Sequence, residues 1–495
     1  MVLSRRLDEA EQRLVASGEA FFHVSGAGHE ALALLADHLL PQDWLHAHYR
    51  DKALLIARGT TVLHFLHGLL ATGESHSAGR QMSAHLSDPP RRVLSMVGPV
   101  GNNALQAVGV AAEVREEPGQ PIVLCCVGEG TTQQGEFYEA VAEAVRDRLP
   151  VLFLVEDNQF AISTRTDGRT FLACPGPFFG LDIHKLDGRH PEACAATFAS
   201  VTRAVRESRG PAILHFQVER LDSHTNADDQ TSYRNADEIR CSREQADPIA
   251  NLRAHLLAGG VPESALTLVE AEAAAEVAAA EKIARAAPDP HAAVSARIPE
   301  SAAERARSEY RGKPGDGALT LGLGMREVLR HHLAADPRVS LFGQDIADPK
   351  GDVFGVTKGL STQFPGRVVN APLAESTIVG KSVGRALAGG RPVAFLQFAD
   401  FLPIAFNQIA TELGSMHWRT NGAWTAPVIV MISCGAYRPG LGPFHAHTFE
   451  SVAAHVPGVD VVMPSNAADA AGLLNAAFAS GRPTLFFYPK ICLND

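Results

Sequence analysis

Two short polar clusters, each following an apolar run, hold the residues best suited to chemistry. Residues 128–130 (Gly-Glu-Gly) follow the run 122–127, and residues 156–158 (Glu-Asp-Asn) follow the run 151–155. Mg²⁺ prefers carboxylate and amide oxygens and usually takes its remaining ligands from phosphate and water. An acid and an amide that converge beside glycines, where backbone can approach a ligand closely, therefore predict a divalent cation bridging to a diphosphate.

The surrounding residues predict the elements that position these clusters. We expect strands over residues 122–127 and 151–155, because short continuous apolar runs are typical of parallel strands buried on both faces. An amphipathic helix is expected between them, over residues 136–148. Such a crossover is right-handed and places both strands in one sheet. Ligands bind at the carboxyl ends of strands in α/β sheets, so the two clusters should meet there.

Length and composition set the class of the protein. A chain of 495 residues is too long for one hydrophobic core, so two or three domains are expected. The net charge of −11 argues against nucleic acid as a partner, because nonspecific binders present a basic face. Scattered cysteines, a charged N-terminal segment unlike a signal peptide, and the lack of a membrane-length apolar run predict a cytoplasmic protein with no membrane partner.

The chain divides at a stretch rich in proline, alanine and charge. Residues 285–317 lack sustained apolar periodicity, which is typical of a linker. We expect one domain over residues 1–284 and a second over residues 318–495. In the second domain the pattern predicts strands at 339–342, 367–369, 392–397, 427–432, 459–462 and 483–488, and helices over 323–334 and from near 375, 404 and 466.

Several motifs, in order, match one family. The chain resembles the thiamine-diphosphate-dependent 2-oxoacid dehydrogenases, the decarboxylating first component of pyruvate and branched-chain complexes, with the α and β subunits fused in that order. The motifs similar to the α subunit are FFHVSGAGHEA (21–31), DWLHAHYRD (43–51), GRQMSAHLS (79–87) and GPVGNNALQAVGVA (98–111). Those similar to the β subunit are NAPLAESTIVGKSVG (370–384), FADFLPIAFNQI (398–409) and PGVDVVMPSNAADAAGLL (457–474). The resemblance implies an α/β fold with two thiamine-diphosphate-binding-fold domains, each a parallel sheet flanked by helices.

The resemblance also implies which residues hold thiamine diphosphate and Mg²⁺. The metal ligands would be Glu129, Asn158 and the backbone carbonyl of Phe160. Tyr49 and Arg50 match residues that bind the diphosphate, to which a guanidinium group offers a planar, permanently charged fork. The other positions that match cofactor contacts are Gly98, Val100, Gly128, Gly130 and Phe401.

Three residues are implied as catalytic. Glu375 matches the glutamate that pairs with a ring nitrogen of the aminopyrimidine, a task that needs a carboxyl group in a dry pocket. The alternative for Glu375 is an ordinary acid stabilised by a helix dipole. His445 matches a histidine beside the reacting carbon, and His224 lies in a segment similar to a mobile loop with an active-site histidine. Histidine suits proton delivery because it titrates near neutrality. His48 and His29 are candidates for the substrate pocket or for a structural role.

Partners follow from the same resemblance. The relatives continue past the position matching Asp495 with a C-terminal transketolase-type domain, so we expect that domain to be absent here or supplied by a separate protein. A lipoyl acyltransferase is a possible further partner. Because the family's diphosphate site and catalytic glutamate generally come from different chains, we expect a homodimer.

Three functions stay open from the sequence. The first is thiamine-diphosphate- and Mg²⁺-dependent decarboxylation of a 2-oxo acid, with transfer of the acyl or enamine unit to a lipoyl group or other acceptor. The second is a stand-alone carboligase that forms carbon–carbon bonds in a specialised biosynthetic pathway. The third is a cofactor-binding scaffold, against which the matched catalytic residues argue. The particular 2-oxo acid is not predictable, because pocket selectivity rests on a few methylenes, each contributing about 1–3 kcal/mol.

Overall fold

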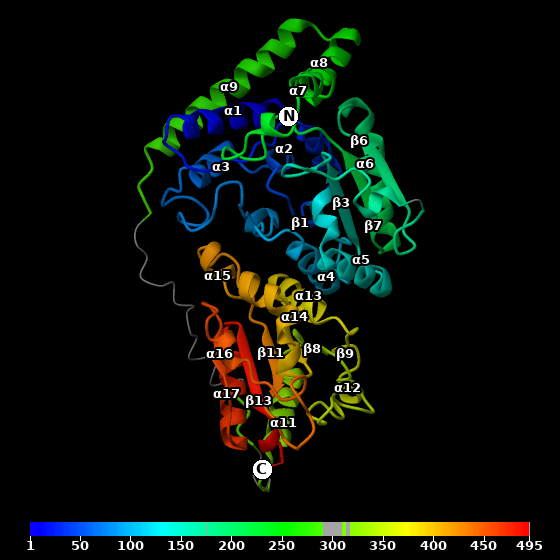
Figure 1. Cartoon of the computed structure of the whole chain (residues 1–495), viewed down its shortest axis with the longest axis vertical. Coiled ribbons are helices and arrows are strands. Elements are labelled where there is room, and N and C mark those ends of the chain that lie inside the picture. The colour runs from blue at the N-terminus through cyan, green and yellow to red at the C-terminus, as the bar shows by residue number, and fades with distance from the viewer. Residues whose placement is uncertain (175, 291–308, 313–316, 495) are drawn as a thin grey trace. The chain divides into compact units, whose positions relative to one another are not determined.

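The structure, a computed structural model, describes residues 1–174, 176–290, 309–312 and 317–494. The chain forms two compact units (Figure 1). One holds residues 1–107, 114–294 and 419–421, and the other holds residues 108–113, 295–418 and 422–495, each as far as it is described. Each unit is built around its own parallel sheet.

The first unit contains a five-stranded sheet of order β1-β2-β3-β7-β6, in which every neighbouring pair is parallel. Its strands are β1 Trp44–His46, β2 Val123–Gly128, β3 Val151–Asp157, β6 Ile183–Asp187 and β7 Ala212–Gln217. β2 and β3 are buried along nearly their whole length, as expected of apolar strands covered on both faces. The predicted strand pair is confirmed, so both polar clusters follow the carboxyl ends of adjacent strands.

The helix between β2 and β3 is amphipathic. Its buried residues recur at the spacing of one helical face: Phe137, Ala140, Val141 and Ala144. The helix, α5 (Gly135–Asp147), ends where Arg148 adopts a φ of 51°, a left-handed conformation common after helix C-termini. The prediction of a helix over residues 136–148 is therefore confirmed, within one residue at each end.

Helices and short turns complete this part of the chain. The further helices are α1 Val2–Ala16, α2 Lys52–Ala57, α3 Val62–Leu69, α4 Asn102–Val114, α6 Cys194–Ser208, α7 Ala236–Gln245, α8 Pro248–Ala258 and α9 Glu263–Arg285. α6 packs against β3, β6 and β7, whereas α1 and α3 pack against α9. A small antiparallel hairpin, β4 (Phe160–Ala161) with β5 (Thr164–Arg165), follows β3 and turns back over the end of the sheet.

The second unit contains a six-stranded parallel sheet of order β12-β13-β11-β10-β8-β9. Its strands are β8 Val339–Gly343, β9 Val368–Asn370, β10 Arg391–Leu396, β11 Ile429–Cys434, β12 Asp460–Val462 and β13 Thr484–Pro489. The helices are α11 Leu321–Ala335, α12 Leu360–Gln363, α13 Glu375–Leu387, α14 Leu402–Asn407, α15 Met416–Arg419, α16 Glu450–Ala453 and α17 Ala467–Ser480. The strands and helices predicted here are confirmed, and α13 packs against β10 and β8.

Much of the predicted linker, residues 285–317, lies outside the described residues, so that boundary stays a prediction. α9 ends at Arg285, where the predicted linker begins. Among the helices that the structure describes, none has both the length and the apolar character needed to cross a membrane.

Candidate functional site

A cavity of about 480 Å³ opens in the first unit beside the carboxyl ends of β2 and β3. This volume is within the range of small-molecule sites, about 300–1,000 Å³. The sequence-predicted residues that line it are His48, Tyr49, Arg50, Gly98, Val100, Gly128, Glu129, Gly130, Asn158, Phe160 and His224. Residues from well-separated segments therefore meet at the edge of the sheet where α/β folds bind ligands.

Glu129 is the acid that follows β2, and it is only 2% exposed. Its Oε1 accepts a hydrogen bond from the hydroxyl of Thr166 at 2.9 Å, and its Oε2 accepts one from the backbone N–H of Asn158 at 3.4 Å. Burial and the nearby charge of Asp157 raise the pKa of Glu129 to about 7. A cation beside this carboxylate would lower the pKa again, because an opposite charge favours the ionised form.

Asn158 follows β3 and its side-chain amide is held at both ends. Nδ2 lies 3.5 Å from Nε2 of His29, and Oδ1 accepts a hydrogen bond from the backbone N–H of Phe160 at 3.2 Å. Together with Glu129, this segment presents a carboxylate, an amide oxygen and a backbone carbonyl. These hard oxygen donors suit Mg²⁺.

The ring of Phe160 is surrounded by three guanidinium groups. Arg165 lies 4.8 Å from the ring centroid, and Arg220 and Arg234 each lie 5.1 Å from it. A guanidinium group within about 6 Å of an aromatic ring is attracted by its quadrupole. The ring therefore anchors the turn that carries the Phe160 carbonyl.

Only one of the three cavity glycines is required by close packing. A Cβ atom on Gly130 would lie 2.9 Å from Cβ of Ala161, which is too close for van der Waals contact. A Cβ on Gly128 would meet nothing nearer than 3.9 Å, and one on Gly98 would meet nothing within 4 Å. The expected close backbone approach is therefore found at Gly130, whereas Gly128 and Gly98 leave open space.

Arg50 is buried and points its guanidinium group at two backbone carbonyls and a histidine. One arm donates to the carbonyl of Ser25, and the other lies 3.0 Å from Nδ1 and 3.2 Å from the carbonyl oxygen of His224. The side chain of Tyr49 lies next to this pair, with its ring 6.4 Å from that of His224 in an edge-on arrangement. The structure thus brings His224 next to Tyr49 and Arg50, which the sequence predicted in a separate motif.

His224 differs in one respect from the sequence-based expectation. Burial, followed by the positive charges of Arg50 and Arg220, lowers its pKa to about 4. The imidazole is therefore neutral at pH 7 and does not titrate near neutrality, as was expected of a proton-delivering group. The physical reasons are burial, which disfavours the charged imidazole, and then the proximity of two cations.

A buried acid that sequence reasoning did not select lies behind Asn158. Glu156 is fully buried, and its Oε2 lies 2.5 Å from Nδ1 of His29. Burial raises the pKa of Glu156 to about 7 and, with the charge of Arg50, lowers that of His29 to about 3. His29 therefore spans Glu156 and Asn158 and is not among the residues that line the cavity. The sequence signal that could have identified Glu156 was its place in the acidic cluster at the end of β3.

Glu375 lies in the second unit, at the first residue of α13. Its side chain is 9% exposed, and Oε1 accepts a hydrogen bond from Nε2 of Gln344 at 3.3 Å. Gln344 directly follows β8, so the acid faces the carboxyl end of this sheet. The burial suits a carboxyl group that works in a dry pocket, and the position at a helix N-terminus is also favourable to its charge.

His445 and Phe401, also in the second unit, belong to one aromatic cluster. The ring of Phe398 lies 4.8 Å from that of His445 and 5.6 Å from that of Phe401. Nζ of Lys490 donates to the carbonyl oxygen of His445 at 2.6 Å and lies over the Phe398 ring. His445 is thus anchored through its backbone and its ring, whereas its neighbour His447 is exposed.

Both units are α/β structures, and the first presents an oxygen-lined cavity suited to a cation and an anionic ligand. Residues 1–293 match the family described as "Dehydrogenase E1 component", and residues 318–494 match "Transketolase, pyrimidine binding domain". The chain therefore belongs to the dehydrogenase E1 component family, a family of thiamine-diphosphate-dependent enzymes, as its motifs predicted. Its fold class is likewise confirmed.

Curated relatives match each half of the chain separately. The 2-oxoisovalerate dehydrogenase subunit alpha of Bacillus subtilis is 29% identical over 269 residues, which cover 53% of this chain and 81% of the relative. The subunit beta from the same organism is 41% identical over 164 residues, covering 33% of this chain and 50% of the relative. The pyruvate dehydrogenase E1 component subunit beta of Leifsonia xyli is 39% identical over 187 residues, covering 38% of this chain and 55% of the relative. The chain thus spans about half the length of these β relatives.

The two matched families bind thiamine diphosphate with a divalent metal ion, typically Mg²⁺, and these are the cofactors of the chain. The residues present fit this pair. The cavity offers oxygen donors at Glu129 and Asn158 for a cation, and the guanidinium group of Arg50 for phosphate oxygens. Val100 lies on the cavity wall and is 36% exposed, so an apolar surface is available to a ring system.

Proposed function

We propose that the protein decarboxylates a 2-oxo acid and transfers the resulting acyl unit to a lipoyl group or another acceptor, with thiamine diphosphate and Mg²⁺. The observation that carries this proposal is the meeting of Glu129, Asn158 and Phe160 with Arg50 around one cavity. When bound, thiamine diphosphate supplies a carbon nucleophile and a sink for the electron pair released on loss of carbon dioxide. The residues of the protein would bind the cofactor, orient it and move protons.

In the first unit the chain would hold the diphosphate end. Glu129, Asn158 and the Phe160 carbonyl would ligate Mg²⁺, while Tyr49 and Arg50 would contact phosphate oxygens. The other cavity positions in this role are Gly98, Val100, Gly128 and Gly130. A diphosphate beside Arg50 would offset the positive charge that now lowers the pKa of His224. His224 would then titrate nearer neutrality once the cofactor is bound, as proton delivery requires.

In the second unit the chain would supply the activating acid. Glu375 would hold a proton between its carboxyl group and a ring nitrogen of the pyrimidine, and its burial supports that role. Phe401 would pack beside the pyrimidine, and His445 would move a proton at the reacting carbon. Since the family generally combines the two kinds of half-site from different chains, we propose a homodimer with two shared sites. A separate C-terminal-domain protein or a lipoyl acyltransferase would be its further partner.

A second candidate keeps the cofactor and changes the acceptor. One relative, 33% identical over 178 residues, is the acetoin:2,6-dichlorophenolindophenol oxidoreductase subunit beta of Cupriavidus necator. Its name pairs a similar chain with a hydroxyketone. This observation favours the stand-alone carboligase, in which the acyl unit joins an aldehyde or ketone, as the alternative.

Release of carbon dioxide from a 2-oxo acid tests whether the protein is catalytic at all, since both candidate functions require it. The protein, loaded with thiamine diphosphate and Mg²⁺, is incubated with pyruvate and with 2-oxoisovalerate, first with a redox dye and then with lipoamide or an aldehyde. Dye reduction or lipoyl acylation supports the first candidate, and a new carbon–carbon bond supports the second. If neither 2-oxo acid releases carbon dioxide under any of these conditions, the proposal fails for these substrates and its general form is abandoned.

A further inference from the structure

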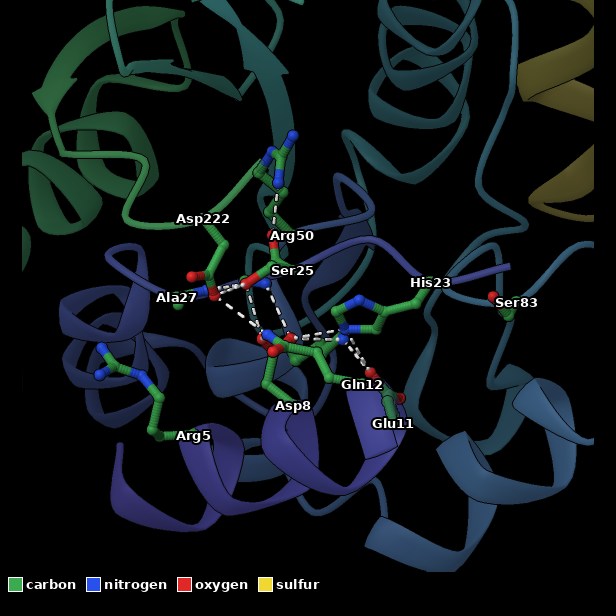
Figure 2. Close-up of polar contacts among 12 residues, drawn as sticks. Arg5, Asp8, Glu11, Gln12, His23, Ser25, Ala27, Arg50, Ser83 and Asp222 are labelled. Carbon is green, nitrogen blue, oxygen red and sulfur yellow. Dashed lines mark hydrogen bonds and ion pairs between the residues drawn. The ribbon is translucent and has the colours of Figure 1, made fainter. Parts of the chain in front are cut away.

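A cluster of buried charged side chains lies outside the cavity lining, where α1 packs against the segment that follows it (Figure 2). We call this set, Asp8, Glu11, His23, Ser25 and Lys52, the α1 cluster. All five side chains are buried. Buried ion pairs are weak evidence for stability, because desolvation offsets much of their attraction. We therefore ask which neighbouring residues the cluster holds in place.

Asp8 is the centre of the α1 cluster. Its Oδ1 accepts hydrogen bonds from Nζ of Lys52 at 2.8 Å, the backbone N–H of Gly26 at 3.0 Å and Nε2 of His23 at 3.2 Å. Its Oδ2 accepts one from the hydroxyl of Ser25 at 2.6 Å. Lys52 also contacts Glu11, so its ammonium group occupies the place that a metal ion would need between the two acids.

One path leads from Asp8 to Arg50. The hydroxyl of Ser25 is fixed by Asp8, and the carbonyl of the same residue accepts a hydrogen bond from the Arg50 guanidinium group (Figure 2). Ser25 is therefore held at both ends. A shift of its hydroxyl would move the carbonyl that orients the guanidinium group.

A second path leads from the α1 cluster to the segment that carries His224. The backbone N–H of His23 donates to Oδ1 of Asn226 at 2.9 Å, and the backbone N–H of Asn226 donates to the carbonyl of His23 at 3.2 Å. Oδ2 of Asp222 lies 3.1 Å from the Ser25 hydroxyl. The segment is thus fastened on both sides of His224 to residues that Asp8 holds.

We propose that Asp8 is a positioning residue for the diphosphate end of the site: through Ser25 and His23 it sets the places of Arg50 and His224. The inference rests on the proposed function, in which Arg50 binds the diphosphate. Asp8 is not among the residues that line the cavity, and the hydrogen bonds described for it reach none of them, so it acts through these two residues.

The test is the affinity for thiamine diphosphate, measured by calorimetry at saturating Mg²⁺. Ser25→Ala and Asp8→Asn should each weaken binding of thiamine diphosphate about tenfold, which corresponds to about 1.4 kcal/mol. Ser25→Thr keeps the hydroxyl and should therefore retain part of the affinity that Ser25→Ala loses. Asp8→Asn should cost less affinity in an Arg50→Gln background than in the wild type, because the two changes share the path through Ser25. Glu9→Gln, at a half-buried neighbour on α1 that is paired with Arg6, is the matched control.

Three outcomes overturn the proposal. If folded Ser25→Ala binds thiamine diphosphate within twofold of the wild type, the path through Ser25 is contradicted. This variant leaves the charges of the α1 cluster intact, so the test can still be made if Asp8→Asn fails to fold. Losses that add fully in the double variant contradict the shared path to Arg50. Full affinity in Arg50→Gln alone removes the proposed diphosphate contact itself, which identifies a failure of the proposed function.

Discussion

The guanidinium group of Arg50 lies 3.0 Å from Nδ1 of His224, although 174 residues separate them in the chain. The same pair joins a proposed phosphate-binding group to a proposed proton carrier. Because a cation at this distance disfavours a protonated imidazole, we expect the pKa of His224 to rise when a phosphate group is bound to Arg50.

This contact predicts the titration of His224. Burial, Arg50 and Arg220 lower its pKa to about 4, so Arg50→Gln should raise the pKa toward the usual value of about 6.5. Loading the wild type with thiamine diphosphate and Mg²⁺ should raise it as well. Imidazole signals followed by NMR across pH 3.5 to 8 measure both shifts. A His224 pKa that stays the same in the variant and the loaded protein would rule out this coupling.

Removing the charge of Glu129 should weaken metal binding. Because burial and Asp157 raise its pKa to about 7, the metal-free wild type should bind Mg²⁺ more tightly as pH rises from 6 to 8 and the carboxyl group ionises. Glu129→Gln should lose at least about tenfold in Mg²⁺ affinity, within the range for metal-site changes, and should lose the pH dependence. Titrations at both pH values test this, with the exposed Asp167→Asn as control. Unchanged affinity in Glu129→Gln would exclude it as a ligand.

The ring of Phe160 should matter through its three guanidinium neighbours. Phe160→Leu removes the aromatic face, which contributes about 0.5–1 kcal/mol to an exposed cation–π contact and about 2 kcal/mol to a desolvated one; Arg220 and Arg234 are buried. We expect Mg²⁺ binding several-fold weaker, because the turn that carries the Phe160 carbonyl loses its anchor. Phe160→Tyr keeps the ring and should bind as the wild type does. Equal affinity in Phe160→Leu would contradict the anchoring role.

The α1 cluster predicts how stability depends on pH. Burial lowers the pKa of His23, but hydrogen bonds to Asp8 and Glu11 outweigh burial and leave the pKa raised. The stabilisation by the charged imidazole is therefore complete below about pH 6.5, the unfolded value, and is lost as pH rises through the folded value. His23→Gln should reduce the free energy of unfolding more at pH 6 than at pH 9. Urea unfolding at both pH values measures this, with the exposed His184→Gln as control; equal losses would speak against it.

The sequence predicted the central elements of both sheets for a simple reason. β2 is apolar up to Val127 and β3 up to Val155, because strands buried on both faces have no polar side, and this pattern is visible without a structure. β1, β6 and β7 were not predicted. β1 has three residues, and β6 is an edge strand with mostly uncovered side chains, whereas β7 is a mostly buried strand between β3 and β6 that sequence reasoning missed.

The difference between local patterns and long-range contacts also explains which residues of the candidate site were predicted. Glu129, Asn158 and Arg50 were found because each lies in a local motif that the family shares. Asp8 and Glu156 were missed because their partners lie far along the chain, and only tertiary packing brings Lys52 to Asp8 or His29 to Glu156. The low pKa of His224 was missed for the same reason, since it depends on Arg50 and Arg220.

The most direct test of the account compares wild type and Glu375→Gln, because this change separates cofactor binding in the first unit from activation by the second. Thiamine diphosphate affinity and carbon dioxide release from a 2-oxo acid are measured on the same Mg²⁺-loaded samples. We predict that Glu375→Gln binds the cofactor within about twofold of the wild type and releases carbon dioxide at least about 100-fold more slowly, as expected when an acid–base group is lost. A variant that binds the cofactor and keeps the full rate would contradict the assignment of Glu375 and the account built on it.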